Sequence, residues 1–222
     1  SHELKTPLAG IRLLTDSILQ TDHMDEETTK EFVTDIGREA ERLSRITENL
    51  LRLTRLDSGV VQQPYPVAVR PVLERVERML TMVAQEKGVT VSGAADEDAV
   101  ALATDDDVHQ ILYNLMENAI KYSAAEDGFV RAEAHVDGDK VVLTVSDNGI
   151  GIPNEDLPHI FDRFYRVDKM RSREVGGTGL GLSIVKDTIE NRGGTISAGH
   201  GANGVGTVFT VYLPLAERGE EA

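Results

Sequence analysis

The chain has 222 residues, enough for one or two domains, and apolar residues make up 40% of it. Its formal net charge of -15 argues against broad binding to nucleic acid or to an anionic membrane, and the absence of cysteine excludes disulfides and zinc–thiolate sites. No apolar run approaches the roughly 20 residues of a membrane span. Because the sequence starts at Ser1 and not at Met, we expect a piece of a longer chain.

Residues 1–58 predict two helices joined by the polar turn TDHMDEET, in which Asp25 is the expected N-cap. Seam residues recur at intervals of four and three in the first helix and mainly every seven in the second, which is typical of a coiled coil. The seam residues are Leu4, Leu8, Ile11, Thr15 and Ile18, followed by Ile36, Leu43, Ile46, Leu50 and Leu53. Two helices cannot bury these stripes alone, so a homodimeric four-helix bundle is favoured over packing on the rest of the chain.

The chain divides into a helical hairpin over residues 1–60, a proline-containing linker over 61–66, a second domain over 67–217 and a charged tail over 218–222. Helices and strands in the second domain do not alternate regularly, which favours helices on one face of a mainly antiparallel sheet. The predicted helices cover 71–87, 104–122 (capped by Thr104) and 180–192, and the predicted strands 89–93, 99–104, 129–136, 140–147, 195–199 and 207–214. The expected fold class is therefore multi-domain: an α hairpin followed by an α/β sandwich.

Two glycine-containing segments carry candidate binding chemistry. DNGIGIP, residues 147–153, follows an apolar strand, and Asp147 at the strand end is an acceptor for an adenine amino group, although an ordinary Asn-Gly turn has the same sequence. GGTGLGLSIV, residues 176–185, opens a helix whose free N–H groups favour phosphate, although a hinge is the alternative. The second segment fits neither a P-loop nor the dinucleotide-binding fingerprint.

A third segment, NLMENAIKYS, lies on the helix predicted over 104–122. Asn114, Asn118 and Lys121 share one face of it, and the apolar residues lie mostly on the other. Amide oxygens and an ammonium group suit Mg²⁺ and phosphate, whereas a solvated helix face is the simpler alternative.

The order of these motifs, with FDRFYR between the glycine segments, resembles the ATP-binding (Bergerat-type) domain of the sensor histidine kinases. SHELKTP in front resembles their phosphoacceptor box, so the resemblance covers roughly residues 1–215. It implies ATP and Mg²⁺ as cofactors, a homodimer formed through the helical hairpin, and a response regulator receiver domain as partner. It also implies the cytoplasmic portion of a membrane-anchored bacterial protein, with any membrane segment outside this chain.

The resemblance further assigns residue roles. Asn118 matches the Mg²⁺ ligand, Arg166 a cation that meets the γ-phosphate, Asp147 the adenine acceptor, and residues 167–176 a mobile lid. Phe161 and Phe164 match the family's Phe box, for which core packing is the alternative. The implied ATP-binding residues are Asn114, Asn118, Lys121, Tyr122, Asp147, Gly149, Gly151, Arg166, Gly177, Thr178, Gly179, Leu180, Gly181 and Thr207.

The implied phosphoacceptor is His2, whose largely neutral imidazole at pH 7 has a lone pair that can attack phosphorus. Glu3 would hold its tautomer and accept a proton, and Thr6 would orient a water that dephosphorylates the regulator. A zincin-type metal site is excluded because Thr6 stands where the second His would be. We therefore expect autophosphorylation of His2 and transfer to an Asp of a response regulator, with regulator phosphatase activity. The alternative is a conformational GHKL-type ATPase or an ATP-sensing scaffold.

Overall fold

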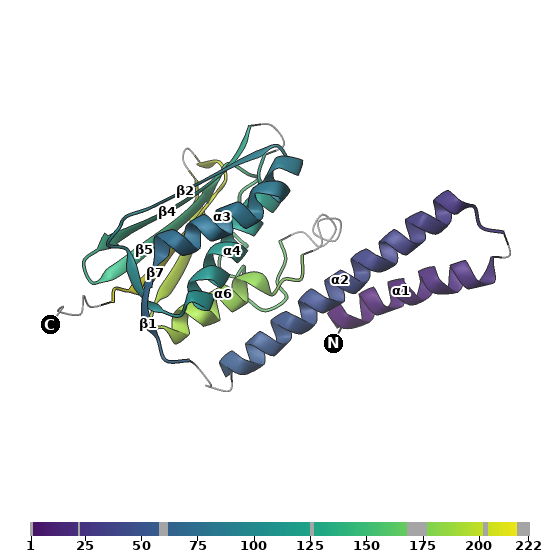
Figure 1. The fold of residues 1–222 in the computed structure, drawn as a ribbon, viewed down its shortest axis with the longest axis horizontal. Helices are drawn as coiled ribbons and strands as arrows, with labels where there is room; N and C mark the ends of the chain where they lie inside the picture. Colours follow the sequence, from purple (N-terminus) through teal and green to yellow (C-terminus); the bar gives the residue numbers. More distant parts are fainter. Residues whose placement is uncertain are drawn as a thin grey trace.

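The computed structural model describes residues 2–21, 23–57, 62–124, 127–167, 177–201 and 204–216. Figure 1 shows a long helical hairpin beside an α/β domain. The hairpin, which we call the stem, consists of α1 (His2–Gln20) and α2 (Glu26–Asp57). Asp25 caps α2, since its carboxylate accepts hydrogen bonds from the Thr28 backbone N–H at 2.8 Å and from the Thr28 hydroxyl at 2.7 Å. These bonds lower the pKa of Asp25, and the predicted N-cap is confirmed.

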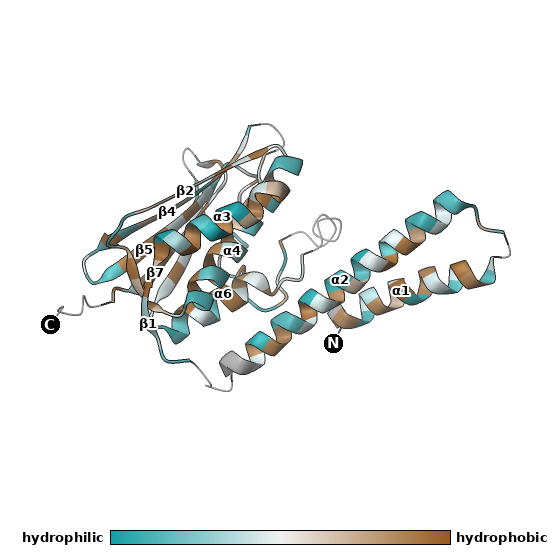
Figure 2. Ribbon diagram, in the orientation of Figure 1, coloured by the Kyte–Doolittle hydropathy of each residue, from teal (hydrophilic) through white to brown (hydrophobic). Residues whose placement is uncertain are grey.

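The stem buries little of its predicted seam within one chain. Helix α1 continues through Pro7, and the buried residues of the stem include Pro7, Arg42, Ile46 and Leu53. Large apolar side chains remain exposed on both helices, and hydrophobic residues extend along the full length of α1 (Figure 2). They are Leu8, Leu13, Leu19, Val33 and Leu51.

The α/β domain is built on a five-stranded sheet of order β2-β4-β5-β7-β6. Strands β2 and β4 are parallel, and the other neighbours are antiparallel. The strands are β2 (Val89–Ala95), β4 (Gly128–Asp137), β5 (Lys140–Asp147), β6 (Thr195–His200) and β7 (Thr207–Pro214). Burial alternates along β4 and β7, as expected for a sheet with one covered face.

A separate two-stranded ribbon differs from the sequence expectation. Strand β1 (Tyr65–Ala68) pairs antiparallel with β3 (Val100–Ala103), and the isolated bridge Ala101–Leu215 joins β3 to the end of β7. The prolines around residue 65 predicted only a linker there. Proline is tolerated in an edge strand, and Pro66 lies in a ribbon of only two strands. The boundaries at residues 60 and 67 stay predictions, and the tail lies outside the described residues.

Helices α3 (Val69–Glu86), α4 (Asp105–Tyr122) and α6 (Gly181–Asn191) cover one face of the sheet (Figure 1). Their apolar faces join the inward side chains of the strands in one core, with Ile111, Leu115, Met116 and Ile120 of α4 at 0–1% exposure. This arrangement confirms the predicted α/β sandwich.

The start of α4 is fixed by a reciprocal capping box. Thr104 accepts a hydrogen bond from the Asp107 backbone N–H at 3.2 Å, and the Asp107 carboxylate accepts one from the Thr104 N–H at 3.0 Å. The predicted Thr104 cap is therefore confirmed, and α4 holds a fixed direction from its first turn.

The stem touches the α/β domain through a small apolar cluster. Leu53 of α2 is 3% exposed and packs with Leu180 and Ile184, the N-cap and an early residue of α6, and Leu50 lies against them. Within the described ranges, no helix combines the length and apolar character needed to cross a membrane.

Candidate functional site

The floor of the candidate site is the carboxylate of Asp147 at the end of β5, which is 5% exposed. Its Oδ1 accepts hydrogen bonds from the backbone N–H of Gly149 at 2.8 Å and of Thr207 at 3.2 Å. Burial raises the pKa of Asp147, and the two N–H donors partly offset this effect. Within the described residues Oδ2 has no hydrogen-bond partner, so it is available to a ligand that brings a donor.

Close backbone packing surrounds this carboxylate. A Cβ on Gly149 would lie 2.0 Å from the Tyr122 carbonyl oxygen, and one on Gly206 would lie 1.8 Å from the Asp147 carbonyl oxygen. Gly151 has a φ of +71°, and a Cβ there would meet the Gly206 carbonyl oxygen at 3.3 Å. The packing beside Asp147 therefore requires glycine at position 149, and the positive φ favours glycine at position 151.

The polar face of α4 lies next to this floor. Asn114 donates from Nδ2 to the Gln110 carbonyl at 2.9 Å, and its Oδ1 would lie 3.0 Å from a Cβ placed on Gly181. Asn118, one turn further, is half-buried, and its amide makes no hydrogen bond to the described residues. An accessible amide oxygen of this kind fits Mg²⁺, which proteins commonly hold through one or two oxygens plus substrate phosphates.

Two cations converge at the end of α4. Burial lowers the pKa of Lys121 to about 8, with Glu117 opposing this shift and the nearby charge of Arg166 adding to it. The Lys121 ammonium lies 5.2 Å from the centre of the Tyr122 ring and would lie 2.7 Å from a Cβ on Gly177. Arg166 also acts on the pKa of Tyr122, which burial raises. The structure thus brings Lys121, Tyr122, Arg166 and Gly177 together, as the resemblance implies.

The loop before α6 faces α4. Its backbone is tied to the FDRFYR segment, because the Phe164 N–H donates to the Gly179 carbonyl at 2.8 Å. The Leu180 N–H donates to the Thr178 hydroxyl at 3.3 Å, and Leu180 precedes the first turn of α6, which starts at Gly181. Gly181 at the start of this helix lies against Asn114 of α4. The first N–H groups of a helix have no partner within the helix, so a helix start at this place suits phosphate.

The two phenylalanines of the FDRFYR segment differ. Phe161 packs edge-on against Phe209 with ring centres 6.4 Å apart, which supports core packing. Phe164 is 38% exposed and has a φ of +68°, a strained value for a bulky residue. Its backbone holds Gly179 while its side chain stays accessible.

The implied phosphoacceptor belongs to the stem and not to the α/β domain. His2 begins α1, but the His2 and Glu3 side chains lie outside the described part, and Thr6 is exposed on the next turn. The predicted lid lies outside the described residues except for Val167. The roles of these residues stay predictions.

Sequence reasoning missed Asn148 and Gly206. The Asn148 side chain accepts a hydrogen bond from the Phe129 N–H at 2.8 Å and donates to the Asp127 carbonyl at 2.8 Å, which fixes the loop before β4. Its position inside the DNG motif was the available signal. Gly206 stands beside Thr207 in sequence, but only the fold shows that it meets Asp147.

Comparison with known proteins agrees with this geometry. The family model "Histidine kinase-, DNA gyrase B-, and HSP90-like ATPase" matches residues 103–217, and "His Kinase A (phospho-acceptor) domain" matches residues 1–59. Sensor histidine kinase WalK of Bacillus subtilis (strain 168) is 35% identical over 225 residues, which cover 100% of this chain and 36% of WalK. The chain thus spans little more than a third of the length of this relative.

Solved structures show the same fold. Acinetobacter baumannii histidine kinase AdeS aligns with a TM-score of 0.77 and 23% identity over 98% of this chain and 99% of AdeS. Histidine kinase ThkA, solved in complex with response regulator protein TrrA, aligns with a TM-score of 0.77 and 23% identity over 98% of this chain and 60% of that chain. This chain consists of a phosphoacceptor domain followed by an ATPase domain, and all of it aligns with part of WalK, so it belongs to the sensor histidine kinases of two-component systems.

Proposed function

We propose that this histidine kinase core transfers the γ-phosphoryl group of ATP to His2 and then to an Asp of a response regulator. The observation that carries the proposal is the arrangement around Asp147, where a buried carboxylate with one oxygen available lies beside the amide and cation face of α4. Asp147 would accept the adenine amino group. Lys121, Arg166 and the N–H groups at the start of α6 would bind the phosphates.

The chemistry needs positioning and charge neutralisation more than covalent help. A ring nitrogen of His2 forms the N–P bond as the bond between the γ-phosphorus and the bridging oxygen breaks, and ADP leaves. Glu3 accepts the imidazole proton. Mg²⁺, held by Asn118, would neutralise phosphate charge when bound.

Two further parts of the proposal concern partners. The exposed apolar residues of the stem favour a homodimer, in which a second copy covers them. The structure of ThkA in complex with a response regulator supports the receiver domain of a response regulator as the phosphate acceptor. Thr6 would orient the water that removes the phosphate from the regulator. Membrane anchoring would come from segments outside this chain.

A conformational ATPase is the second candidate, because the ATPase family model includes gyrase and HSP90 relatives. In such ATPases, a Glu four residues before the metal-binding Asn activates water. Asn114 occupies that position here, and its amide is a poor base that already donates to the Gln110 carbonyl. The residues at this position therefore favour phosphorylation of His2 over ATP hydrolysis.

The test is phosphate incorporation from γ-labelled ATP with Mg²⁺ into the parent chain and into His2→Gln, Asn118→Ala and His23→Gln. We expect acid-labile label in the parent and in the His23→Gln control and none in the other two variants. Release of free phosphate at equal rates from the parent and His2→Gln, without label on protein, would overturn the autokinase proposal in favour of the ATPase.

A further inference from the structure

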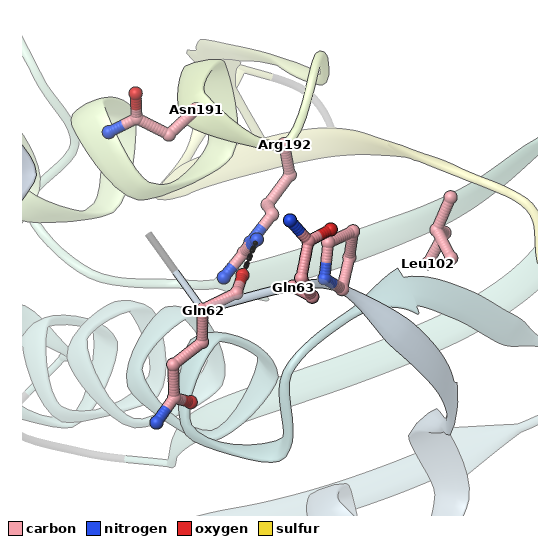
Figure 3. A pocket seen from close by; sticks show the side chains of 6 residues that line it. Gln62, Gln63, Leu102, Asn191 and Arg192 are labelled. Carbon is pink, nitrogen blue, oxygen red and sulfur yellow. Dashed lines mark hydrogen bonds between the residues drawn. The ribbon is translucent and has the colours of Figure 1, made fainter. Parts of the chain in front are cut away.

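A buried arginine joins three segments on the side of the domain away from the nucleotide residues. Arg192 follows the last residue of α6, and its side chain is only 5% exposed. Its Nε donates to the Asp107 Oδ2 at 2.7 Å, and its Nη1 donates to the backbone carbonyl of Gln62 at 2.7 Å. Figure 3 shows this guanidinium lying against the Gln62 carbonyl. One side chain therefore connects α6, the start of α4 and the chain that arrives from the stem.

The carboxylate that receives Arg192 is itself fixed. Oδ2 of Asp107 also accepts hydrogen bonds from the Thr104 N–H at 3.0 Å and the Thr104 hydroxyl at 2.7 Å. The Asp107 side chain is 16% exposed, so the ion pair is shielded from water on both sides. A shielded, geometrically fixed pair holds its partners more firmly than a surface ion pair does.

The connecting segment has few other attachments. Within the described part of the chain, Gln62, Gln63 and Pro64 make no hydrogen bond except the one from Arg192. A hollow of about 260 Å³ lies beside them, lined also by Leu102 and Asn191 (Figure 3). The next firm attachment is strand β1, where Tyr65 pairs with Ala103.

Helices α4 and α6 connect the Arg192 contact with the residues that would bind the nucleotide. Helix α4 starts at the capping box that Arg192 contacts and carries Asn114, Asn118 and Lys121 further along. Helix α6 starts at Gly181, beside the implied phosphate loop, and ends next to Arg192. Both helices that would bind the nucleotide are therefore joined at their far ends to the segment that leaves the stem.

We propose that Arg192 is a positioning residue for phosphoryl transfer, fixing Gln62 to α4 and α6 and so setting the point about which the ATP-binding domain turns relative to the stem. This inference rests on the proposed autokinase function. Without Arg192, the first described attachment of the chain that arrives from α2 moves from Gln62 to Tyr65 at the start of β1, which lengthens the tether by three residues. Effective concentration falls roughly as the −3/2 power of tether length, so the rate of phosphorylation should fall at least about two-fold.

The experiment measures geometry and activity separately. Because the chain has no cysteine, Glu48→Cys on α2 and Glu133→Cys on β4 provide a clean pair of spin-label sites, and excess unlabelled chain suppresses distances between copies. The distance distribution is compared between the parent, Arg192→Met and Arg192→Lys. Lys186→Gln is the matched control, since Lys186 forms an exposed ion pair with Glu190 at 3.8 Å on the same helix.

We expect Arg192→Met to broaden the distance distribution by at least about half and to lower kcat for phosphorylation, with KM for ATP within two-fold of the parent. Arg192→Lys keeps the charge but lacks the two donor nitrogens of the guanidinium, so its distance distribution and kcat should lie between those of the parent and Arg192→Met. Lys186→Gln should match the parent. An unchanged distribution in folded Arg192→Met overturns the inference, as does a loss confined to ATP affinity. Arg192→Gln replaces Arg192→Met with the same criteria if the latter does not fold. If no chain incorporates phosphate, the autokinase proposal fails, while the distances still decide where the domain turns.

Discussion

The stem and the ATP-binding domain make opposite use of their apolar residues. In the domain, helices α3, α4 and α6 cover the sheet and share one core with it. In the stem, Ile46 and Leu53 are the buried aliphatic residues among those described, and Leu53 is buried against the domain. Leu8, Leu13 and Leu19 remain 61–78% exposed on α1.

This difference indicates what each part needs in order to be complete. The domain closes its core with its own residues, and the carboxylate of Asp147 and the amide of Asn118 stay available together with the 64% exposed side chain of Ile150, so a nucleotide would complete it. The stem has an apolar surface that a polar ligand cannot satisfy, so a second copy would complete it. The following predictions test this contrast, from the largest expected effect to the smallest.

Gly149→Ala should abolish nucleotide binding and leave the stem unaffected. The new Cβ would lie 2.0 Å from the Tyr122 carbonyl, so backbone on one side of the site must move. We expect ATP affinity to fall at least about 100-fold and the domain to lose about 1–3 kcal/mol of stability. Calorimetric ATP titration and thermal unfolding measure these changes. Gly199→Ala is the control, because a Cβ there meets nothing within 4 Å; ATP binding retained by Gly149→Ala would contradict this account.

Leu8→Asp should break the dimer and leave the nucleotide site intact. A charge at this seam position, 61% exposed in one chain, would be buried without a partner in the four-helix bundle. We expect dimerisation to weaken by at least about 3 kcal/mol, measured by sedimentation equilibrium. Arg38→Asp puts the same carboxylate on a side chain that is 76% exposed and lies two residues from the seam residue Ile36, on the other side of α2, and should keep the dimer. Equal dimerisation of Leu8→Asp and the parent would remove Leu8 from the interface.

Asp147→Asn should weaken ATP binding while preserving the fold. An amide oxygen can still accept from the Gly149 and Thr207 N–H groups, but the new NH₂ would face the adenine amino group as a second donor. We expect a loss of about 1.5–3 kcal/mol in ATP affinity, with the unfolding temperature little changed. Asp162→Asn, at an exposed carboxylate, should bind ATP as the parent does. A large fall in stability without a loss of affinity would show that Asp147 is only structural.

Raising the pH should weaken ATP binding through Lys121, whose pKa is about 8. Above that pH the ammonium loses its proton and with it the attraction for phosphate. The affinity for ATP should then fall by at most about ten-fold per pH unit. The stability of the free protein changes in the opposite sense. The unfolded chain keeps this proton up to about pH 10, so the contribution of Lys121 to folding rises between about pH 8 and 10.

Affinity measured at pH 7, 8 and 9 in the parent and in Lys121→Gln tests this prediction. The decline should be absent from Lys121→Gln, and the same decline in both proteins would assign it to another group.

The sequence predicted most of the domain because its signals are local. Thr104 with Asp107 marked the start of α4, and alternation of apolar residues marked β4 and β7. The sequence did not predict β1, because Pro66 disfavours a strand inside a sheet. Only the pairing with β3 explains why residues 65–68 form a strand, in a ribbon of two strands.

The candidate site was predicted from motif order and not from geometry. Spacing on a helix placed Asn114, Asn118 and Lys121 on one face, but nothing local showed that Arg166 would lie near Lys121 or that Gly206 would meet Asp147. Arg192 carried no motif at all. Its contacts with Asp107 and Gln62 join residues far apart in the sequence, which only the folded chain reveals.

The most direct test of the contrast is differential scanning calorimetry of the whole chain at two protein concentrations, each with and without Mg²⁺-ATP. We predict two transitions. One should rise in temperature with protein concentration and ignore the nucleotide, and the other should rise with Mg²⁺-ATP and ignore protein concentration. A single transition that responds to both, or a stem transition independent of protein concentration, would contradict the proposal that a second copy completes the stem and a nucleotide completes the domain.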